Sequence, residues 1–432
     1  MIAKDHLAPE SLMMSHGYNP YWSEGAVKCP IYQTSTFVFH TAEEGKAFFE
    51  LAYGKKEDKT GKGPGLIYSR LNNPDMQILE ERLTLWDKAE ACAAFESGMS
   101  AIATTIMALL QPGDLLLYSN PVYGGTHHFI HHVLTKWGIH VIGFNAGQNE
   151  EEIENLLLDS GLAHKLKMIY VETPANPTND LIDIAVCAHI AQSHSTPENR
   201  VLVTVDNTYM GPIWQHPLKH GADLVCYSAT KYIGGHSDVI AGAVLGSMDL
   251  IAKVKTLRTF LGNMIAPFTG WLLLRSLETL KVRMAQQAKN TRKVAEYLAH
   301  HPLVEKVYYP GFYSETNKPA QYEIYQRQCE GSGAMLSFDI RGGEKKAFTF
   351  LNHLKLVKLA VSLGGTESLA EHPYTMTHAD VPDEEKEGMG LTESMVRLSV
   401  GVENHKDLIW DLGQALEMVE LKHRPTMAGA AN

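Results

Sequence analysis

The amino-acid sequence predicts an α/β fold in which helices flank a mostly parallel sheet and a smaller α/β domain follows toward the C-terminus. Two observations lead to this prediction. Short apolar runs alternate with helical stretches, as in sheets whose parallel strands are joined by crossover helices. Polar residues also stand directly after several runs, where the carboxyl ends of parallel strands collect functional groups. The apolar runs are 115–118, 141–144, 168–172, 201–205 and 224–227.

The helices and the remaining strands follow from the same patterns. Residues 75–87 have an amphipathic period, and Ser97 opens an apolar helix that runs to about Leu110. Residues 271–300 are predicted to form one long helix that links the sheet domain to the C-terminal domain. In that second domain, residues 333–340 and 396–400 are predicted to be strands.

The first 72 residues show no long amphipathic period and are predicted to be irregular. Residues 54–65 are rich in Gly and Lys, which predicts an exposed loop. The glycines are wrongly spaced for a Walker A motif, and Gly63 follows Lys62 where Ser or Thr is required. At the other end, the tail after about residue 421 is expected to be frayed.

Composition and charge exclude several classes of protein. The chain has 432 residues, which favours two or more folding units. Its formal net charge is −11 and no basic block stands out, so nucleic-acid binding is not expected. The five cysteines are far apart without a C-x-x-C, which favours a reducing compartment. No secretory signal and no membrane-spanning run is found, so we expect a cytoplasmic protein.

The segment 228–236 (SATKYIGGH) carries the strongest chemical signal. Lys231 follows a buried strand, and partial desolvation lowers the pKa of such an amine and favours its attack on an aldehyde. Ser228 and Thr230 place two hydroxyl groups beside it, which suits a phosphate. These groups match a lysine-bound aldehyde cofactor with a phosphate, although any α/β protein can carry a loop lysine after a strand.

Two further elements fit such a cofactor. Asp206 ends the strand that lies 25 residues before Lys231, and a carboxylate there can pair with a pyridinium nitrogen. Ser97, Gly98 and Met99 open a helix whose first N–H groups can bind a phosphate. Each element alone is weak evidence for a cofactor site, because an Asp that caps a turn and a Ser-Gly before a helix are both common.

In combination these motifs resemble the Cys/Met-metabolism family of pyridoxal-phosphate (PLP) enzymes, over about residues 32–416. The resemblance implies a PLP-dependent aminotransferase-like fold of type I. It also implies an N-terminal arm (1–72) that contacts a neighbouring subunit, a PLP-binding domain (73–275) and a C-terminal domain (276–432). The motifs that carry it are 68–70 with Asn73-Pro74, 96–99, 123–126, 172–178, 206–208, 228–235, 362–365 and 396–401.

The resemblance also implies a role for each site residue. Lys231 would hold the cofactor as a Schiff base and then move protons, and Asp206 would pair with the ring nitrogen. Tyr123 would stack on the ring and act as an acid toward the leaving group. The phosphate would be bound by Gly98, Met99, Ser228 and Thr230, and by Tyr68 and Arg70 of a neighbouring subunit. Arg397 would bind the substrate carboxylate, with Asn176 and Ser362 orienting it and the cofactor.

The implied activity is γ-elimination from a sulfur amino acid such as L-methionine or L-cystathionine, giving 2-oxobutanoate, ammonia and a thiol. The alternative is γ-replacement, as in cystathionine γ-synthase or O-acylhomoserine sulfhydrylase. Val361 favours a methionine lyase, whereas Gly125 and residues 364–371 are closer to the cystathionine enzymes. Arg258-Thr259 lacks the Asp that methionine lyases often show nearby. The family also implies a homo-oligomer, usually a dimer of dimers.

The sequence gives weaker support to functions of other classes. His127 with His131 and His128 with His132 are i,i+4 pairs that could bind a metal ion, but no further ligand accompanies them. We therefore expect no metal site there. A regulatory protein on the same fold is disfavoured, because Lys231 and Asp206 are both present. A nicotinamide-dependent oxidoreductase is disfavoured because no G-x-G-x-x-G follows an early strand.

Overall fold

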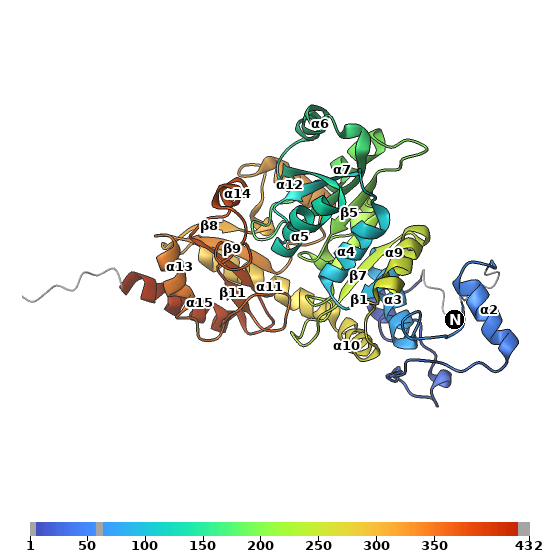
Figure 1. Cartoon of the computed structure of the whole chain (residues 1–432). Helices are drawn as coiled ribbons and strands as arrows, with labels where there is room; N and C mark the ends of the chain where they lie inside the picture. The colour runs from blue at the N-terminus through green and yellow to red at the C-terminus, as the bar shows by residue number, and fades with distance from the viewer. Residues whose placement is uncertain (1–5, 58–63, 422–432) are drawn as a thin grey trace, which may run out of the picture.

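The computed structural model of the chain describes residues 6–57 and 64–421 (Figure 1). A seven-stranded sheet in the order β1-β7-β6-β5-β4-β2-β3 forms its larger part. Neighbouring strands are parallel except at β7, which runs antiparallel to both β1 and β6. The strands are β1 (Ala91–Phe95), β2 (Leu115–Asn120), β3 (His140–Asn145), β4 (Leu166–Glu172), β5 (Leu202–Asp206), β6 (Leu224–Ser228) and β7 (Gly242–Gly246).

Helices cover both faces of this sheet, because alternate side chains of each buried strand point to opposite sides. Val225 and Tyr227 of β6 pack in the cluster formed with α3 and α10, whereas Leu224 and Cys226 pack on the other face with α4 and α9. A third cluster joins β2, β4 and β5 to α6 and α7. These helices are α3 (Pro74–Asp87), α4 (Gly98–Leu109), α6 (Glu150–Asp159), α7 (Ile184–Ser193), α9 (Met248–Leu261) and α10 (Pro267–Leu277).

A second sheet of five strands, in the order β10-β11-β12-β9-β8, forms the smaller part. Helices α11, α13 and α15 pack against it around an apolar core. The strands are β8 (Val304–Tyr308), β9 (Met335–Ile340), β10 (Lys358–Leu359), β11 (Leu369–Glu371) and β12 (Met395–Ser399). The helices are α11 (Leu280–Ala299), α13 (Glu344–Leu351) and α15 (His405–Leu421).

The predicted fold class is confirmed: a mostly parallel sheet is flanked by helices, and a smaller α/β part follows. The predicted apolar runs became β2 to β6, β9 and β12. Strands β1 and β7 were not predicted, because ACAAF and GAVLG contain small residues with a weak strand signal. The division of the chain at residues 72 and 275 stays a prediction.

The prediction of one helix over residues 271–300 is wrong, because α10 ends at Leu277 and α11 begins at Leu280. Thr279 between them has φ −110° and ψ 5°, outside the helical range. Arg283 stabilises the break. Its guanidinium donates hydrogen bonds to the carbonyl oxygens of Ser276 (3.0 Å) and Tyr232 (2.8 Å), so the interrupted chain keeps its polar groups paired.

The prediction that the first 72 residues are irregular is also wrong in part, because α2 (Ala42–Ala52) is a helix of three turns. Thr41 caps it by accepting the N–H of Glu44 at 3.1 Å. Figure 1 shows α2 at one end of the molecule, away from both sheets. Residues 58–63 of the predicted loop and the tail from residue 422 lie outside the described residues.

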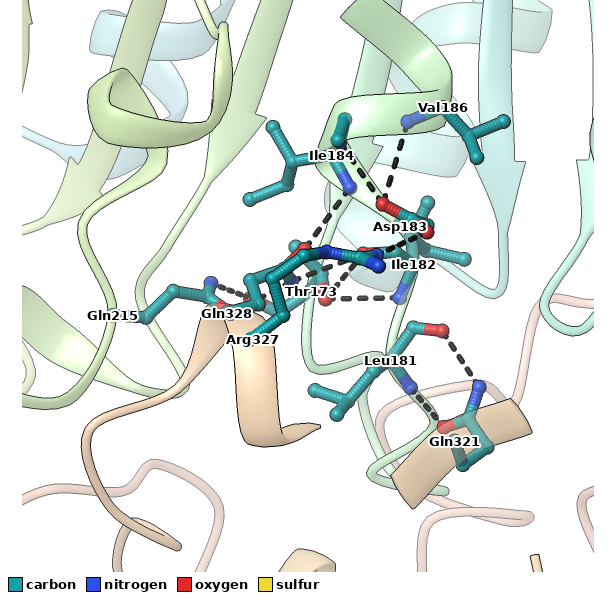
Figure 2. Close-up of polar contacts among 11 residues, drawn as sticks. Thr173, Leu181, Ile182, Asp183, Ile184, Val186, Gln215, Gln321, Arg327 and Gln328 are labelled. Carbon is teal, nitrogen blue, oxygen red and sulfur yellow. Dashed lines mark hydrogen bonds and ion pairs between the residues drawn. The ribbon is translucent and has the colours of Figure 1, made fainter. Parts of the chain in front are cut away.

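Helix α12 (Pro319–Gln328) of the C-terminal half forms hydrogen bonds with the loop that follows β4 (Figure 2). Gln321 accepts the N–H of Leu181 at 2.6 Å and donates to its carbonyl at 2.8 Å. About two turns further along the same face of the helix, Gln328 accepts the N–H of Ile184 and donates to the carbonyl of Ile182, both at 3.0 Å. We call this pair of glutamines the glutamine clasp.

The remaining short helices are α1 (Pro9–Leu12), α5 (Gly124–Phe129), α8 (Gly211–Trp214) and α14 (Asp383–Gly388). Among the helices that the structure describes, none has the length and apolar character needed to cross a bilayer.

Candidate active site

A cavity of about 570 Å³ lies where the strand-end loops of the large sheet meet loops of the C-terminal half. It is the place where most of the predicted site residues come together. All of them line it except Tyr68 and Arg70. Those that do are Gly98, Met99, Tyr123, Asn176, Asp206, Ser228, Thr230, Lys231, Ser362 and Arg397.

Lys231 projects into this cavity from the turn after β6. Its Nζ donates a hydrogen bond to Ser362 Oγ at 2.9 Å, across from the other half of the chain. Burial, and then the nearby cation of Arg397, lower the pKa of the amine to about 8. At neutral pH more of this amine is therefore neutral than in an ordinary lysine, which favours its action as a nucleophile.

The start of α4 and the end of β6 form a cradle for an anion. A Cβ on Gly98 would lie 2.8 Å from the Cβ of Ser228, so only glycine allows the two backbones to approach this closely. Ser97 caps α4 by accepting the N–H of Ser100, which leaves the first N–H groups of the helix directed at the cavity. This cradle fits a phosphate group at a helix N-terminus.

The two predicted hydroxyl ligands differ in this structure. Ser228 Oγ has no hydrogen-bond partner among the described side chains and backbone, so it can donate to a phosphate. Thr230 Oγ1 instead donates to the carbonyl of Ala241 at 3.1 Å and accepts its N–H at 2.9 Å. A phosphate would therefore have to compete with the Ala241 carbonyl for the Thr230 proton.

Asp206 ends β5 at the floor of the cavity and is almost completely buried. One carboxyl oxygen accepts the N–H of Thr208 at 3.0 Å, and the other accepts the hydroxyl of Tyr170 at 3.4 Å. Burial raises the pKa of this carboxyl, while the hydrogen bonds of Thr208 oppose the increase. A cationic ring nitrogen placed beside it would favour the carboxylate form, as a pyridine cofactor requires.

Arg397 lies on β12 and is buried, but it is not unpaired. Its Nη1 contacts Glu371 Oε1 at 2.7 Å and Asn176 Oδ1 at 3.1 Å, and Nη2 donates to the carbonyl of Ser362 at 3.1 Å. These three contacts leave part of the guanidinium fork for a further acceptor, since arginine carries five N–H groups. An anionic carboxylate in the cavity is the ligand that suits it.

One part of the cavity lining is apolar. Ile240, Val361 and Met376 all line it and are 69%, 55% and 37% exposed. We call these three residues the apolar lining. None of them can pair with a charge, so this part of the cavity suits an uncharged substrate group.

Tyr68 and Arg70 do not line the cavity of their own chain. Arg70 donates from Nη1 to the carbonyl of Thr259 at 2.9 Å, and its guanidinium lies 5.8 Å from the centre of the Tyr68 ring. Tyr68 is 41% exposed. Both residues are accessible on the surface of the single chain.

The histidines of 127–132 span α5 and the π-helical turn that follows it, residues Ile130–Leu134. His131 shares a hydrogen bond of 2.7 Å with the hydroxyl of Tyr118, and His127 faces Glu385 at 3.5 Å. Over residues 6–57 and 64–421, no three His, Cys, Asp or Glu side chains are arranged to hold a metal ion.

Sequence reasoning gave no role to two buried carboxyl groups of the site. Glu172 lines the cavity at the end of β4, and Glu371 pairs with Arg397 across β11 and β12. The signal for Glu172 was its place at a strand end, as for Asp206. For Glu371 the sequence offered only one acidic residue inside a short apolar strand, and its partner is a cross-strand neighbour 26 positions away.

Comparisons with known proteins show the family to which the chain belongs. The family model described as Cys/Met metabolism PLP-dependent enzyme matches residues 10–417. An L-methionine gamma-lyase of Fusobacterium nucleatum is 41% identical over 91% of this chain and 94% of that protein. A cystathionine gamma-lyase of Rattus norvegicus is 39% identical over 92% of each chain.

Solved structures give the same result. A cystathionine gamma synthase from Xanthomonas oryzae pv. oryzae, in complex with aminoacrylate and cysteine, superposes with a TM-score of 0.84 at 32% identity, over 96% of this chain and 99% of the other. A cystathionine gamma-lyase from Lactobacillus plantarum, complexed with L-serine, has a TM-score of 0.82 at 34% identity, over 96% and 100%. The chain therefore belongs to the family of Cys/Met-metabolism PLP-dependent enzymes.

Proposed function

We propose that this protein is a carbon–sulfur lyase that converts L-methionine or L-cystathionine to 2-oxobutanoate, ammonia and a thiol, with consumption of one water. The observation that carries the proposal is the position of Lys231 in one cavity with Asp206, the phosphate cradle and Arg397. When bound, pyridoxal phosphate supplies an electron sink for the carbanion at the substrate Cα.

Each residue of the chain then has a distinct task. Lys231 holds the cofactor and afterwards moves protons at Cα and Cβ of the substrate, for which its lowered pKa is suited. Asp206 keeps the ring nitrogen protonated, and the residues of the cradle bind the phosphate. Arg397 binds the substrate carboxylate, and Asn176 and Ser362 orient it through their contacts with the guanidinium.

Tyr123 lies directly before α5 and lines the cavity on that side. Its ring lines the cavity and is 43% exposed, so it can stack on a flat cofactor. Its hydroxyl can also donate a proton to the departing sulfur. A sulfur protonated as it leaves departs as a neutral thiol.

The apolar lining supports L-methionine as the first choice of substrate. Methionine ends in an uncharged thioether, which Ile240, Val361 and Met376 can contact without desolvating a charge. The distal end of cystathionine carries both an amino and a carboxylate group, and Val361 offers neither of them a partner.

γ-Replacement, with a thiol added in place of the leaving group, is the second candidate. Gly125 and the segment 364–371 are closer to the cystathionine enzymes, and a cystathionine gamma synthase is among the similar solved structures. Both reactions share every residue assigned above and differ only in whether a thiol reaches the cavity before product leaves.

The experiment that separates the two is a product assay on purified protein. We would supply L-methionine, L-cystathionine or O-acetyl-L-homoserine, with and without a thiol, and quantify 2-oxobutanoate and thioether. The proposal predicts 2-oxobutanoate from methionine without added thiol. Thioether formed only from the activated homoserine would contradict it and assign γ-replacement.

We propose further that the working form is a homo-oligomer of at least two chains, arranged as a dimer of dimers, with Tyr68 and Arg70 serving the cavity of a neighbour. Support comes from the arm, where Tyr21, Trp22 and Val38 are 90%, 68% and 94% exposed. Apolar side chains exposed to this degree favour burial against another chain.

Mixed oligomers test the shared site. R70A and K231A subunits should each be inactive alone, and their co-expressed mixture should regain activity, because one cavity then receives Arg70 and Lys231 from different chains. Activity that stays absent from a mixed oligomer verified by mass would place both residues in one chain. Light scattering of the wild type gives the number of subunits.

We also propose a cytoplasmic location. All five cysteines are free thiols in this structure, and four of them are buried, as suits a reducing compartment. Fractionation of the source cells with an antibody to the protein would test it, and recovery in a secreted fraction would contradict it.

A further inference from the structure

The ring of Tyr123 faces the cavity, yet its position is set by main-chain contacts. Among the described residues, no side chain forms a hydrogen bond with its hydroxyl. Its backbone N–H donates to Glu172 Oε2 at 2.7 Å. Gly125 leaves room for the ring, since a Cβ there would lie 2.6 Å from Tyr123 Cε1. Glu172 is therefore the side chain that fixes where the chain turns into α5.

Glu172 is itself held firmly. It ends β4, is 4% exposed and lines the cavity. Its own N–H donates to Ser119 Oγ at 3.0 Å. In the sheet it is the register partner of Asp206 on β5, so the two carboxyl groups lie at adjacent strand ends.

Two buried carboxyl groups this close do not both ionise readily. Burial raises the pKa of Glu172 well above its ordinary value, and the negative charge of Asp206 adds to the increase. The N–H groups of Tyr123 and Asn176 and the cation of Arg397 oppose the increase at Glu172. The hydrogen bonds of Thr208 and the Tyr170 hydroxyl oppose the smaller increase at Asp206. The pKa increase is the larger at Glu172, which favours the proton on Glu172 and the charge on Asp206.

We propose that Glu172 is a positioning residue that holds the main chain of Tyr123 and thereby sets the angle of its ring over the cavity. It acts as a neutral acid, with Oε2 accepting the Tyr123 N–H. The inference deepens the proposed function and rests on its assignment of Tyr123 to the cofactor ring.

The test compares Glu172→Gln and Glu172→Ala in the full-length holoenzyme. Glutamine keeps an acceptor oxygen in a neutral group, so kcat should fall less than about threefold and its pH profile should not move. Alanine leaves the Tyr123 N–H without a partner, and kcat should fall about tenfold or more. Ser119→Ala is the matched control, because it removes a buried hydrogen bond of Glu172 without touching Tyr123.

Two readouts do not depend on turnover. The visible circular dichroism of bound pyridoxal phosphate reports how Tyr123 lies on the ring, and it should change in Glu172→Ala but not in the other two variants. The infrared band of a protonated carboxyl should be present in wild type and Ser119→Ala and lost in Glu172→Gln. Thermal midpoints of all variants show which losses come from unfolding.

The outcomes separate clearly. A Glu172→Ala variant with wild-type dichroism and kcat would overturn the positioning role. A Glu172→Gln variant as impaired as Glu172→Ala, without the infrared band in wild type, would show that the group acts as an anion. A wild type that binds the cofactor but makes no 2-oxobutanoate would count against the proposed function alone, since the dichroism comparison still decides the role of Glu172.

Discussion

The polar and apolar parts of the cavity lining are built differently. Much of the polar part comes from strand ends of the large sheet, where Asp206 lies in the β5–β6 ladder, Ser228 lies in the β6–β7 ladder and Lys231 follows in the next turn. The apolar lining comes from loops, and its residues are substantially exposed. A sheet edge thus holds the residues to which the proposed function assigns the chemistry, and loops hold those to which it assigns the choice of substrate.

The largest expected effect concerns the polar part. Under the proposed function, Lys231→Ala removes the group that holds the cofactor and moves the protons, so turnover should fall by about 10³-fold for every substrate. The same loss with methionine and cystathionine, measured as 2-oxobutanoate formation, would confirm that this part is indifferent to substrate. Lys136→Ala, at an exposed lysine, is the control and should keep wild-type turnover.

Val361→Glu tests the apolar lining. A carboxylate beside an uncharged thioether should lower kcat/KM for methionine about tenfold, while the ratio of cystathionine to methionine turnover rises. Val361→Leu keeps the apolar character and should leave the ratio close to that of the wild type. An unchanged ratio in Val361→Glu would mean that this residue does not meet the distal end of the substrate.

The pH dependence of cofactor attachment tests the lowered pKa of the Lys231 amine. The pKa of its amine is lowered to about 8, so the reactive neutral form grows as the pH rises toward that value and is dominant above it. The rate at which apoprotein binds pyridoxal phosphate should rise from pH 6 and level off above about pH 8. A rate that keeps rising to the ordinary pKa of lysine would contradict the desolvated environment.

The glutamine clasp, which joins the C-terminal half to the loop after β4, has the smallest expected effect. Gln321→Ala leaves the buried N–H and carbonyl of Leu181 without partners, so the free energy of unfolding should fall by about 1–3 kcal/mol. Gln326→Ala, on the exposed side of the same helix, should change it by less than about 0.5 kcal/mol. Denaturant unfolding measures both, and equal losses would argue against the clasp.

Much of the polar part of the cavity lining could be predicted from the sequence, because several of its residues follow apolar runs that predict buried strands. Lys231 and Asp206 were found in this way, whereas Gly98 was found at the predicted start of an apolar helix. The break at Thr279 could not be predicted, since it contains neither Pro nor Gly and depends on distant contacts of Arg283. Helix α2 was missed although Thr41 and Glu44 carry a readable capping signal.

The residues that escaped prediction share a physical cause. Glu371 reaches Arg397 only because β11 and β12 pair antiparallel, and Met376 reaches the cavity from a loop without a periodic pattern. Such contacts depend on tertiary pairing, which a local pattern does not encode.

The proposed role of Lys231 is tested by locating the residue to which the cofactor is attached. The purified holoenzyme would be treated with borohydride, which makes the bond between a lysine amine and pyridoxal phosphate permanent, then digested and examined by mass spectrometry. If Lys231 holds the cofactor, the reduced pyridoxyl phosphate will be found on Lys231 alone. Attachment at another lysine, or at none in cofactor-saturated protein, would contradict it.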